Sequence, residues 1–150
     1  MQKRPPPTRG GVARRDRVLV DSGAWIALLR ARDRHHEDAD GSFRRALRER
    51  AELITTNLIV AEVHRFLLFH MGIRPAALFL ERIDLSPQLG IEYVSAVHHQ
   101  RARQWLTRLS DQVISYTDAV SFAVMEESAC TAAISFDNDF VIAGFELWRN

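Results

Sequence analysis

The sequence has a single cysteine, Cys130, among its 150 residues. One thiol cannot form an intramolecular disulfide, and it cannot supply the several thiolates of a Cys-based zinc site. No apolar run is long enough to span a bilayer, and the basic start of the chain lacks the apolar stretch of a secretory signal. The sequence therefore predicts a cytoplasmic protein that does not cross a membrane.

Glycine-rich nucleotide-binding motifs are also missing. The first predicted strand is followed by "DSGAW", which lacks the G-x-G-x-x-G of a dinucleotide fold, and no G-x-x-x-x-G-K-[ST] occurs. A phosphatase with an aspartate nucleophile typically has a second acid two residues after the first, where this chain has Gly23. These absences argue against all three enzyme classes.

Charge is distributed unevenly along the chain. The net charge is +1, but residues 1–17 hold six basic residues and one acid, so the remainder carries +1 − 5 = −4. We predict a basic, flexible leader over residues 1–17 and a single domain over residues 18–150. Such a leader could be simply solvated, or it could contact the phosphates of a nucleic acid.

Hydrophobic patterning predicts an alternation of strands and helices. Apolar runs indicate strands at 17–21, 52–55, 90–96, 113–115, 131–136 and 145–149. Amphipathic spacing indicates helices at 22–31, 38–51, 57–71, 74–85, 98–111 and from near Thr117 to about Ser128, with Asn57 expected as an N-cap and Pro75 at a first helical position. This order predicts an α/β protein with a mostly parallel sheet of four to five strands, covered by helices on both faces.

Acidic residues recur where predicted strands end and helices begin. They are Asp21, Glu62, Asp118, Asp137 and Asp139. In parallel sheets, ligands bind beyond the carboxyl ends of the strands, which is where these acids are expected. Taken singly, each has a structural explanation: a helix cap, a residue facing water, the third residue of a helix capped by Ser115, or a turn.

Taken together, the acids predict a metal site. Clustered carboxylates repel one another, and a divalent cation relieves that repulsion. Because the candidate ligands are hard oxygens, with no cysteine among them, Mg²⁺ or Mn²⁺ is expected rather than Zn²⁺. Carboxylate-held Mg²⁺ that keeps several waters suits the hydrolysis of phosphodiesters.

Four segments in order, "VLVDSGAWIALL", "TNLIVAEVHRF", "YTDAVSFAVM" and "AISFDNDF", resemble the motifs of PIN-domain ribonucleases, most closely the VapC-type toxins of bacterial toxin–antitoxin pairs. The resemblance implies a three-layer PIN-like sandwich and a metal-dependent endoribonuclease that inhibits translation. It further implies an RNA substrate, a cognate VapB-like antitoxin and a homodimer. The catalytic acids and metal ligands that it implies are Asp21, Glu62, Asp118 and Asp137, with Asp139 as a further metal ligand and Ser22, Asn57 and Thr117 as supporting residues.

Two further interpretations stay open at this stage. Arg30, Arg32 and Arg34 follow the Asp21 segment and could line a path for RNA, or they could simply form a solvated face. His35, His36, His98 and His99 are expected at exposed positions, and none of the six histidines is expected in catalysis. The alternative function is a non-catalytic PIN-like module that binds RNA or a protein partner.

Overall fold

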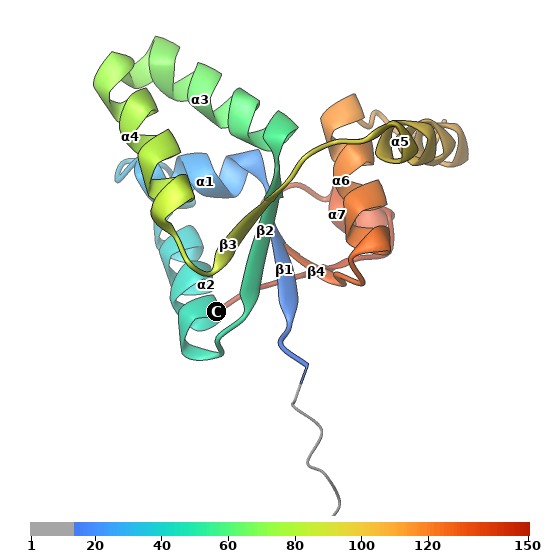
Figure 1. Ribbon diagram of the computed structural model, residues 1–150, viewed down its shortest axis with the longest axis horizontal. Helices are drawn as coiled ribbons and strands as arrows, with labels where there is room; N and C mark the ends of the chain where they lie inside the picture. Colours follow the sequence, from blue (N-terminus) through green and yellow to red (C-terminus); the bar gives the residue numbers. More distant parts are fainter. Residues whose placement is uncertain (1–13) are drawn as a thin grey trace, which may run out of the picture.

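The computed structural model describes residues 14–150 and contains a five-stranded sheet in the order β3-β2-β1-β4-β5 (Figure 1). The strands are β1 (Arg17–Val20), β2 (Glu52–Thr56), β3 (Leu89–Glu92), β4 (Ala132–Ile134) and β5 (Glu146–Leu147). Every strand pairing within the described residues is parallel, as expected. Most of the predicted leader lies outside these residues, and its last residue, Arg17, begins β1.

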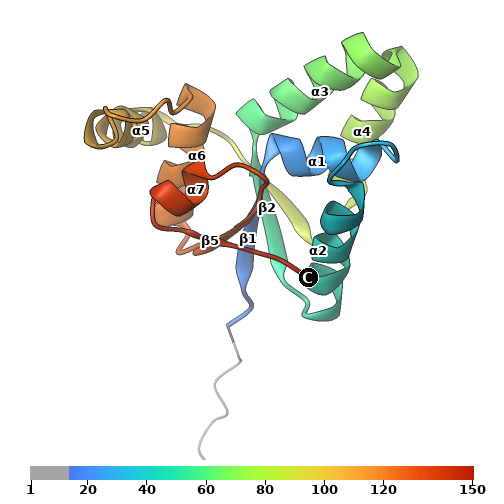
Figure 2. The ribbon, with the colours of Figure 1, turned by 180° about the vertical axis from the view of Figure 1, so that it is seen from behind.

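Helices cover the sheet on both faces, which confirms the expected three layers (Figures 1 and 2). One layer holds α1 (Ser22–Leu29), α2 (His36–Arg48), α3 (Asn57–Met71) and α4 (Ile73–Leu85). The other holds α5 (Ala96–Arg108), α6 (Tyr116–Glu127) and α7 (Asp139–Ile142). The short helix α7 was not predicted. No helix within residues 14–150 is both long enough and apolar enough to cross a membrane.

The core is densest around β1 and α6. Val18, Leu19 and Val20 are completely buried, so the strand reads as a continuous apolar run. Helix α6 is buried along most of its length, and its Phe122 ring packs edge-on against Phe140 at 5.2 Å. Because this helix is held on nearly all sides, the acid in its first turn, Asp118, has a fixed place relative to the sheet.

The order of the strands places a crevice beside β1. The chain runs from β1 outward through β2 and β3, and then returns to the other side of β1 with β4 and β5. The point where the strand order reverses is called a topological switch point. There the connections leave the sheet in opposite directions, which opens a crevice at the carboxyl ends of the strands. The register pairs Val20 with Ile134, so the residues that follow β1 and β4 become neighbours at this edge.

Two predicted strands differ from the structure. Strand β3 ends at Glu92, four residues before the predicted end, because its partner β2 turns into α3 after Thr56 and leaves no ladder to pair with. Residues 113–115 form no strand, and Val113 is 99% exposed. The apolar character of this segment therefore reflects a loop that enters α6, with no neighbouring strand to pair with.

Three local predictions also need correction. Thr56, not Asn57, caps α3, because the Thr56 hydroxyl accepts a hydrogen bond from the backbone amide of Ile59 at 3.1 Å. Pro75 is the third residue of α4 rather than the first. His98 is buried instead of exposed: its ring bonds to Glu127 at 2.8 Å and accepts from the amide of Ser95.

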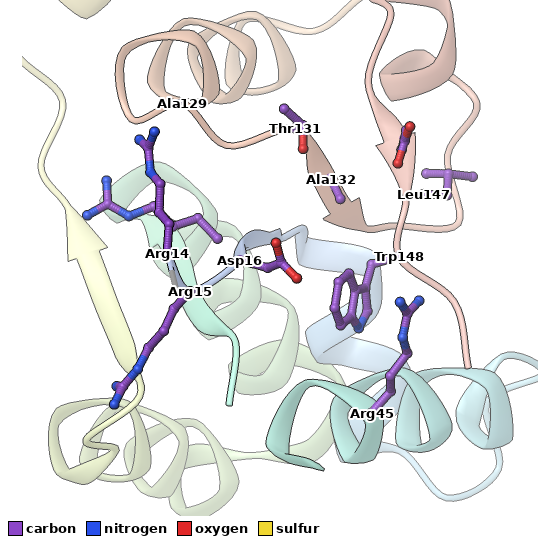
Figure 3. Close-up of a pocket in the computed structure, with 11 residues that line it drawn as sticks. Arg14, Arg15, Asp16, Arg45, Ala129, Thr131, Ala132, Leu147 and Trp148 are labelled. Carbon is purple, nitrogen blue, oxygen red and sulfur yellow. The ribbon is translucent and has the colours of Figure 1, made fainter. Parts of the chain in front are cut away.

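The amino end of the sheet forms a separate pocket, about 400 Å³ in volume, between the first residues of β1, β4 and β5. Its arginines and acids come from several elements, and Arg45 of α2 lies 3.8 Å over the indole ring of Trp148 (Figure 3). This pocket lies at the opposite end of the strands from Asp21.

Candidate active site

Asp21 is the buried acid at the bottom of the site. It follows β1, and only 6% of its surface is exposed. Its carboxylate accepts a hydrogen bond from the amide of Ser22 at 2.8 Å and another from the hydroxyl of Ser135 at 2.9 Å. Burial, with the charge of Asp118 as the second cause, raises the pKa of Asp21 to about 7, although both hydrogen bonds act in the opposite direction.

Asp118 reaches the site from the first turn of α6. The Ser115 hydroxyl caps this helix by accepting from the Asp118 amide at 3.1 Å, and it donates to the Asp118 carboxylate at 2.8 Å. Both interpretations of Asp118 are therefore compatible. It is the third residue of a helix that Ser115 caps, and it also belongs to the acidic site. Burial raises its pKa to about 6, against the effect of the Ser115 bond.

The loop between β4 and α7 supplies two more carboxylates. Asp137 is exposed, and its carboxylate accepts from the amide of Asp139 at 3.1 Å. The amide of Asp137 in turn donates to the Ser135 hydroxyl at 3.0 Å. Burial raises the pKa of Asp139, and the neighbouring charge of Asp137 adds to this shift. The turn expected at "FDNDF" is thus present and also directs two acids to one place.

Three of these carboxylates converge closely enough to hold one cation. Asp118, Asp137 and Asp139 each offer an oxygen, and these oxygens lie within 4.8 Å of one another. Opposite ligands of an octahedral Mg²⁺ are about 4 Å apart, at roughly 2.1 Å from the ion each. Within residues 14–150, no arginine, lysine or histidine forms an ion pair with them. An all-oxygen donor set, in which the pKa values of Asp118 and Asp139 are raised and which has no cationic partner within the described residues, fits a divalent metal ion.

Glu62 occupies a looser position than its place in the sequence indicated. Its side chain is exposed on α3 and it is outside the three-acid cluster. Its charge nevertheless contributes to the raised pKa of Asp118, as the smallest of the causes. The structure thus brings four aspartates together and leaves the glutamate at the rim.

The three supporting residues have different surroundings. Ser22 touches the site through its backbone amide, which donates to Asp21. The Asn57 side chain accepts from the amide of Val94 at 3.0 Å, so it ties the start of α3 to the loop after β3. Thr117 makes no side-chain hydrogen bond to the described part of the chain, and the side-chain bond to Asp118 comes from Ser115.

Ser135 is the site residue that sequence reasoning missed. It is 2% exposed and links two of the acids, because its hydroxyl donates to Asp21 and accepts from the amide of Asp137. A signal was available: a serine that ends a fully apolar strand, directly before an acidic turn, has to place its hydroxyl against a polar partner.

A groove of about 730 Å³ adjoins the acids. Its walls come from the start of α1, the α1–α2 loop and the loop after β4. The lining residues are Asp21, Ser22, Gly23, Ile26, Arg30, Arg32, Asp33, Arg34, His35, Phe136, Asp137 and Asn138. All three arginines of the α1–α2 segment therefore lie along the groove and not on a remote solvated face.

The fold and the acidic edge define a known class of protein. The PIN domain family model matches residues 18–146, and the chain belongs to this family. The PIN-domain family expected from the four motifs is therefore confirmed.

The chain is similar to VapC20 of Mycobacterium tuberculosis in sequence and in structure. The chain is 34% identical over 129 residues to the 23S rRNA-specific endonuclease VapC20 of Mycobacterium tuberculosis, covering 85% of this chain and 95% of that protein. The crystal structure of M. tuberculosis VapC20, a sarcin–ricin loop cleaving toxin, superposes with a TM-score of 0.77 at 32% identity and covers 89% and 99% of the two chains.

A more distant structure shares the fold alone. FitAcB from Neisseria gonorrhoeae has a TM-score of 0.66 at 15% identity, over 87% of this chain and 96% of that one. The resemblance to VapC-type toxins is thus confirmed by sequence and by structure.

Proposed function

We propose that this chain is a metal-dependent endoribonuclease of the VapC type, which hydrolyses RNA phosphodiester bonds at the acidic edge of its sheet. One observation carries the proposal: oxygens of Asp118, Asp137 and Asp139 converge within 4.8 Å beside the buried Asp21. Separate segments of the chain supply these acids, and no cation within residues 14–150 neutralises them.

Mg²⁺ or Mn²⁺ is the proposed cofactor, because every candidate ligand is a carboxylate oxygen. Asp118, Asp137 and Asp139 would hold the ion. Asp21 and, at the rim, Glu62 are the other two acids of the proposed site. When bound, such an ion polarises a phosphoryl oxygen and lowers the pKa of an attacking water. Ser22 and Ser135 hold the Asp21 carboxylate in place, and Ser115 holds that of Asp118.

Ribosomal RNA is the proposed substrate, by similarity to the 23S rRNA-specific relative. The groove beside the acids supports this choice, since Arg30, Arg32 and Arg34 lie along it and guanidinium groups bind phosphates. An attack on the sarcin–ricin loop would inhibit translation, and the cytoplasm is accordingly the proposed place of action.

A VapB-like antitoxin is the proposed protein partner. An apolar groove of about 340 Å³ lies between α1, α2 and α4, and Trp25, Phe43 and Phe79 line it. Leu47 at its edge is 59% exposed, although it is large and apolar. These features suit the apolar face of an amphipathic antitoxin helix.

A homodimer is proposed through the corner between α3 and α4. Phe69 is 70% exposed and Ile73 is 79% exposed, although both are large and apolar. Sedimentation of the parent should give a dimer, and Phe69→Glu should shift it toward the monomer. A monomeric parent in the absence of antitoxin would exclude this assembly.

The decisive experiment compares RNA cleavage by the parent with cleavage by Asp118→Asn and Asp21→Asn, in Mg²⁺ or Mn²⁺ after removal of any antitoxin. Metal assistance contributes several kcal/mol, so each substitution should slow cleavage by about 10²- to 10⁴-fold. Asp84→Asn, an exposed aspartate on α4, is the matched control and should cleave like the parent. Unchanged cleavage by both variants, or an inactive parent, would favour the non-catalytic binding module.

A further inference from the structure

An aromatic pair stands in the groove directly beside the acidic cluster. The rings of His35 and Phe136 are stacked, with centroids 4.3 Å apart and planes 5° from parallel. Both residues line the groove and both are only half-buried, so the pair is not part of the closed core. Phe136 lies between Ser135 and Asp137 in the sequence, and both of these neighbours are bonded within the site. The stack therefore has a fixed position relative to the metal-binding acids.

The His35 side of the stack is held in place by the α1–α2 loop. The carboxylate of Asp33 accepts from the amide of His35 at 2.9 Å, and the ring of His36 bonds to the carbonyl of Ala27 at 2.8 Å. The Nε of Arg34 donates to Nε2 of His35 at 3.0 Å, which fixes the edge of the imidazole ring. A parallel ring pair is a suitable platform for stacking a planar base.

Positive charge flanks the stack along the same groove. Arg30, Arg32 and Arg34 all line it, and within residues 14–150 none of them forms an ion pair with a carboxylate. The Arg30 guanidinium lies 5.3 Å from the centre of the Phe66 ring, which holds it beside α3. A platform for a base, cations for its phosphates and acids for a metal ion thus occur in one continuous groove.

We propose that the His35–Phe136 pair is a base-stacking subsite, which holds one unpaired nucleotide next to the scissile phosphate of the RNA. The subsite rests on the proposed function, because it assigns part of the substrate to the same groove. An unpaired base is required, since only a base outside a helix has a free face to stack on an aromatic side chain. The arginines along the groove hold the phosphates on either side of this nucleotide.

The chain contains its own control for this proposal. His70 and Phe66 on α3 form a second histidine–phenylalanine stack, with centroids 4.0 Å apart and planes 11° from parallel. This stack is outside the groove lining. The substitution His70→Ala therefore removes the same kind of contact as His35→Ala, but outside the groove, and it leaves in place the Phe66 ring against which Arg30 lies.

Binding is measured in EDTA, so that no cleavage occurs, with short single-stranded RNAs that carry 2-aminopurine at each position in turn. Stacking on an aromatic side chain quenches this base. We expect strong quenching at one position with the parent, and its loss in His35→Ala and Phe136→Leu. The dissociation constant should rise about 5- to 150-fold in both variants. Phe136→Tyr and His70→Ala should behave like the parent.

An abasic nucleotide at the quenched position sharpens the test. It should weaken binding to the parent by the same factor as His35→Ala, and the combination should cause no further loss. Equal affinity and equal quenching in the parent, His35→Ala and Phe136→Leu would overturn the subsite and leave the pair as packing for the α1–α2 loop. Quenching that depends on His35, in a protein that cleaves no RNA with Mg²⁺ or Mn²⁺, would instead refute the proposed activity and retain the subsite.

Discussion

Charged side chains are arranged differently at the two ends of the sheet. At the amino end, Arg17 pairs with Glu52 at 2.9 Å, and Arg45 pairs with Glu49 at 2.9 Å (Figure 3 shows Arg45 against Trp148). At the carboxyl end, several aspartate carboxylates lie close together, and within residues 14–150 none of them forms an ion pair with a cationic side chain. The pKa values of Asp21 and Asp118 are raised to about 7 and about 6, mainly by burial.

The ion pairs at the amino end are ordinary surface contacts, whereas the clustered carboxylates at the carboxyl end indicate a functional site. Exposed opposite charges that meet contribute little to stability, and they cost little to keep. Like charges at a buried edge destabilise the fold, so the surrounding packing has to hold them together. A protein whose acids only capped helices would have no reason to bring four aspartates to one end of one sheet. The predictions below test this contrast, from the largest expected effect to the smallest.

Cleavage should depend on acids at one end of the sheet only. Asp137→Asn removes a metal-binding oxygen while keeping an acceptor for the amide of Asp139, and should slow RNA cleavage by about 10²- to 10³-fold. Glu146→Gln changes an exposed acid in the pocket at the other end and should leave the rate unchanged. Equal effects of the two substitutions in a cleavage assay would remove the distinction between the two ends.

Stability of the metal-free protein should fall as the pH rises from about 4 to 7. In the unfolded chain Asp21 loses its proton near pH 3.8, whereas in the folded protein it does so near pH 7. The unfolded state binds fewer protons in this window, so the free energy of unfolding decreases with pH, by an amount on the order of a few kcal/mol. Thermal unfolding in EDTA between pH 4 and 8 measures this slope.

The matched variant for that slope is Asp21→Asn, which has no proton to lose. Its melting temperature should vary less with pH than that of the parent, and at pH 8 it should exceed the parent value. A parent whose stability rises through this pH range would contradict the raised pKa of Asp21.

A divalent cation should offset the loss of folding stability that the clustered carboxylates cause. At a concentration 100 times the dissociation constant, binding to the folded state alone raises the free energy of unfolding by about 2.7 kcal/mol. The effect should be larger at pH 8 than at pH 5, because protonated carboxylates are poor ligands. Thermal unfolding with Mn²⁺ or Mg²⁺ measures it, and Asp118→Asn should respond weakly. An identical response in Asp118→Asn would place the ion elsewhere.

The serine that links two acids should have an intermediate effect. Ser135→Ala removes the hydroxyl that donates to Asp21 and accepts from Asp137, so both acids lose a fixed position. A lost hydrogen bond to a charged group corresponds to about 1.5–3 kcal/mol, which predicts cleavage slower by roughly 10- to 150-fold. Ser115→Ala, at an exposed position, should slow cleavage less. Initial rates at saturating metal decide the order.

The smallest effect is expected at the amino end. The Arg17 and Glu52 side chains are 39% and 45% exposed, so Glu52→Gln should change the free energy of unfolding by no more than about 1 kcal/mol. Cleavage should stay at the parental rate. A large loss of activity in Glu52→Gln would show that the two ends of the sheet are coupled.

The sequence by itself determined the layered α/β architecture, since apolar runs alternate with amphipathic segments and this alternation depends only on local periodicity. The four motifs also identified the family and five candidate acids, because each acid follows a recognisable strand or lies in the first two turns of a helix. Errors occurred at the ends of elements, as in β3 and at residues 113–115, where pairing with a neighbour decides whether an extended segment becomes a strand.

Only the tertiary structure decided which acids meet and what holds them. Residues 21, 118 and 135 are distant in the sequence, and the register of β1 with β4 and the packing of α6 bring them together. The same packing left Glu62 exposed at the rim and buried Ser135 between the carboxylate of Asp21 and the backbone amide of Asp137. Distances between side chains, and therefore pKa values and metal geometry, depend on contacts across the sheet that no local pattern in the chain encodes.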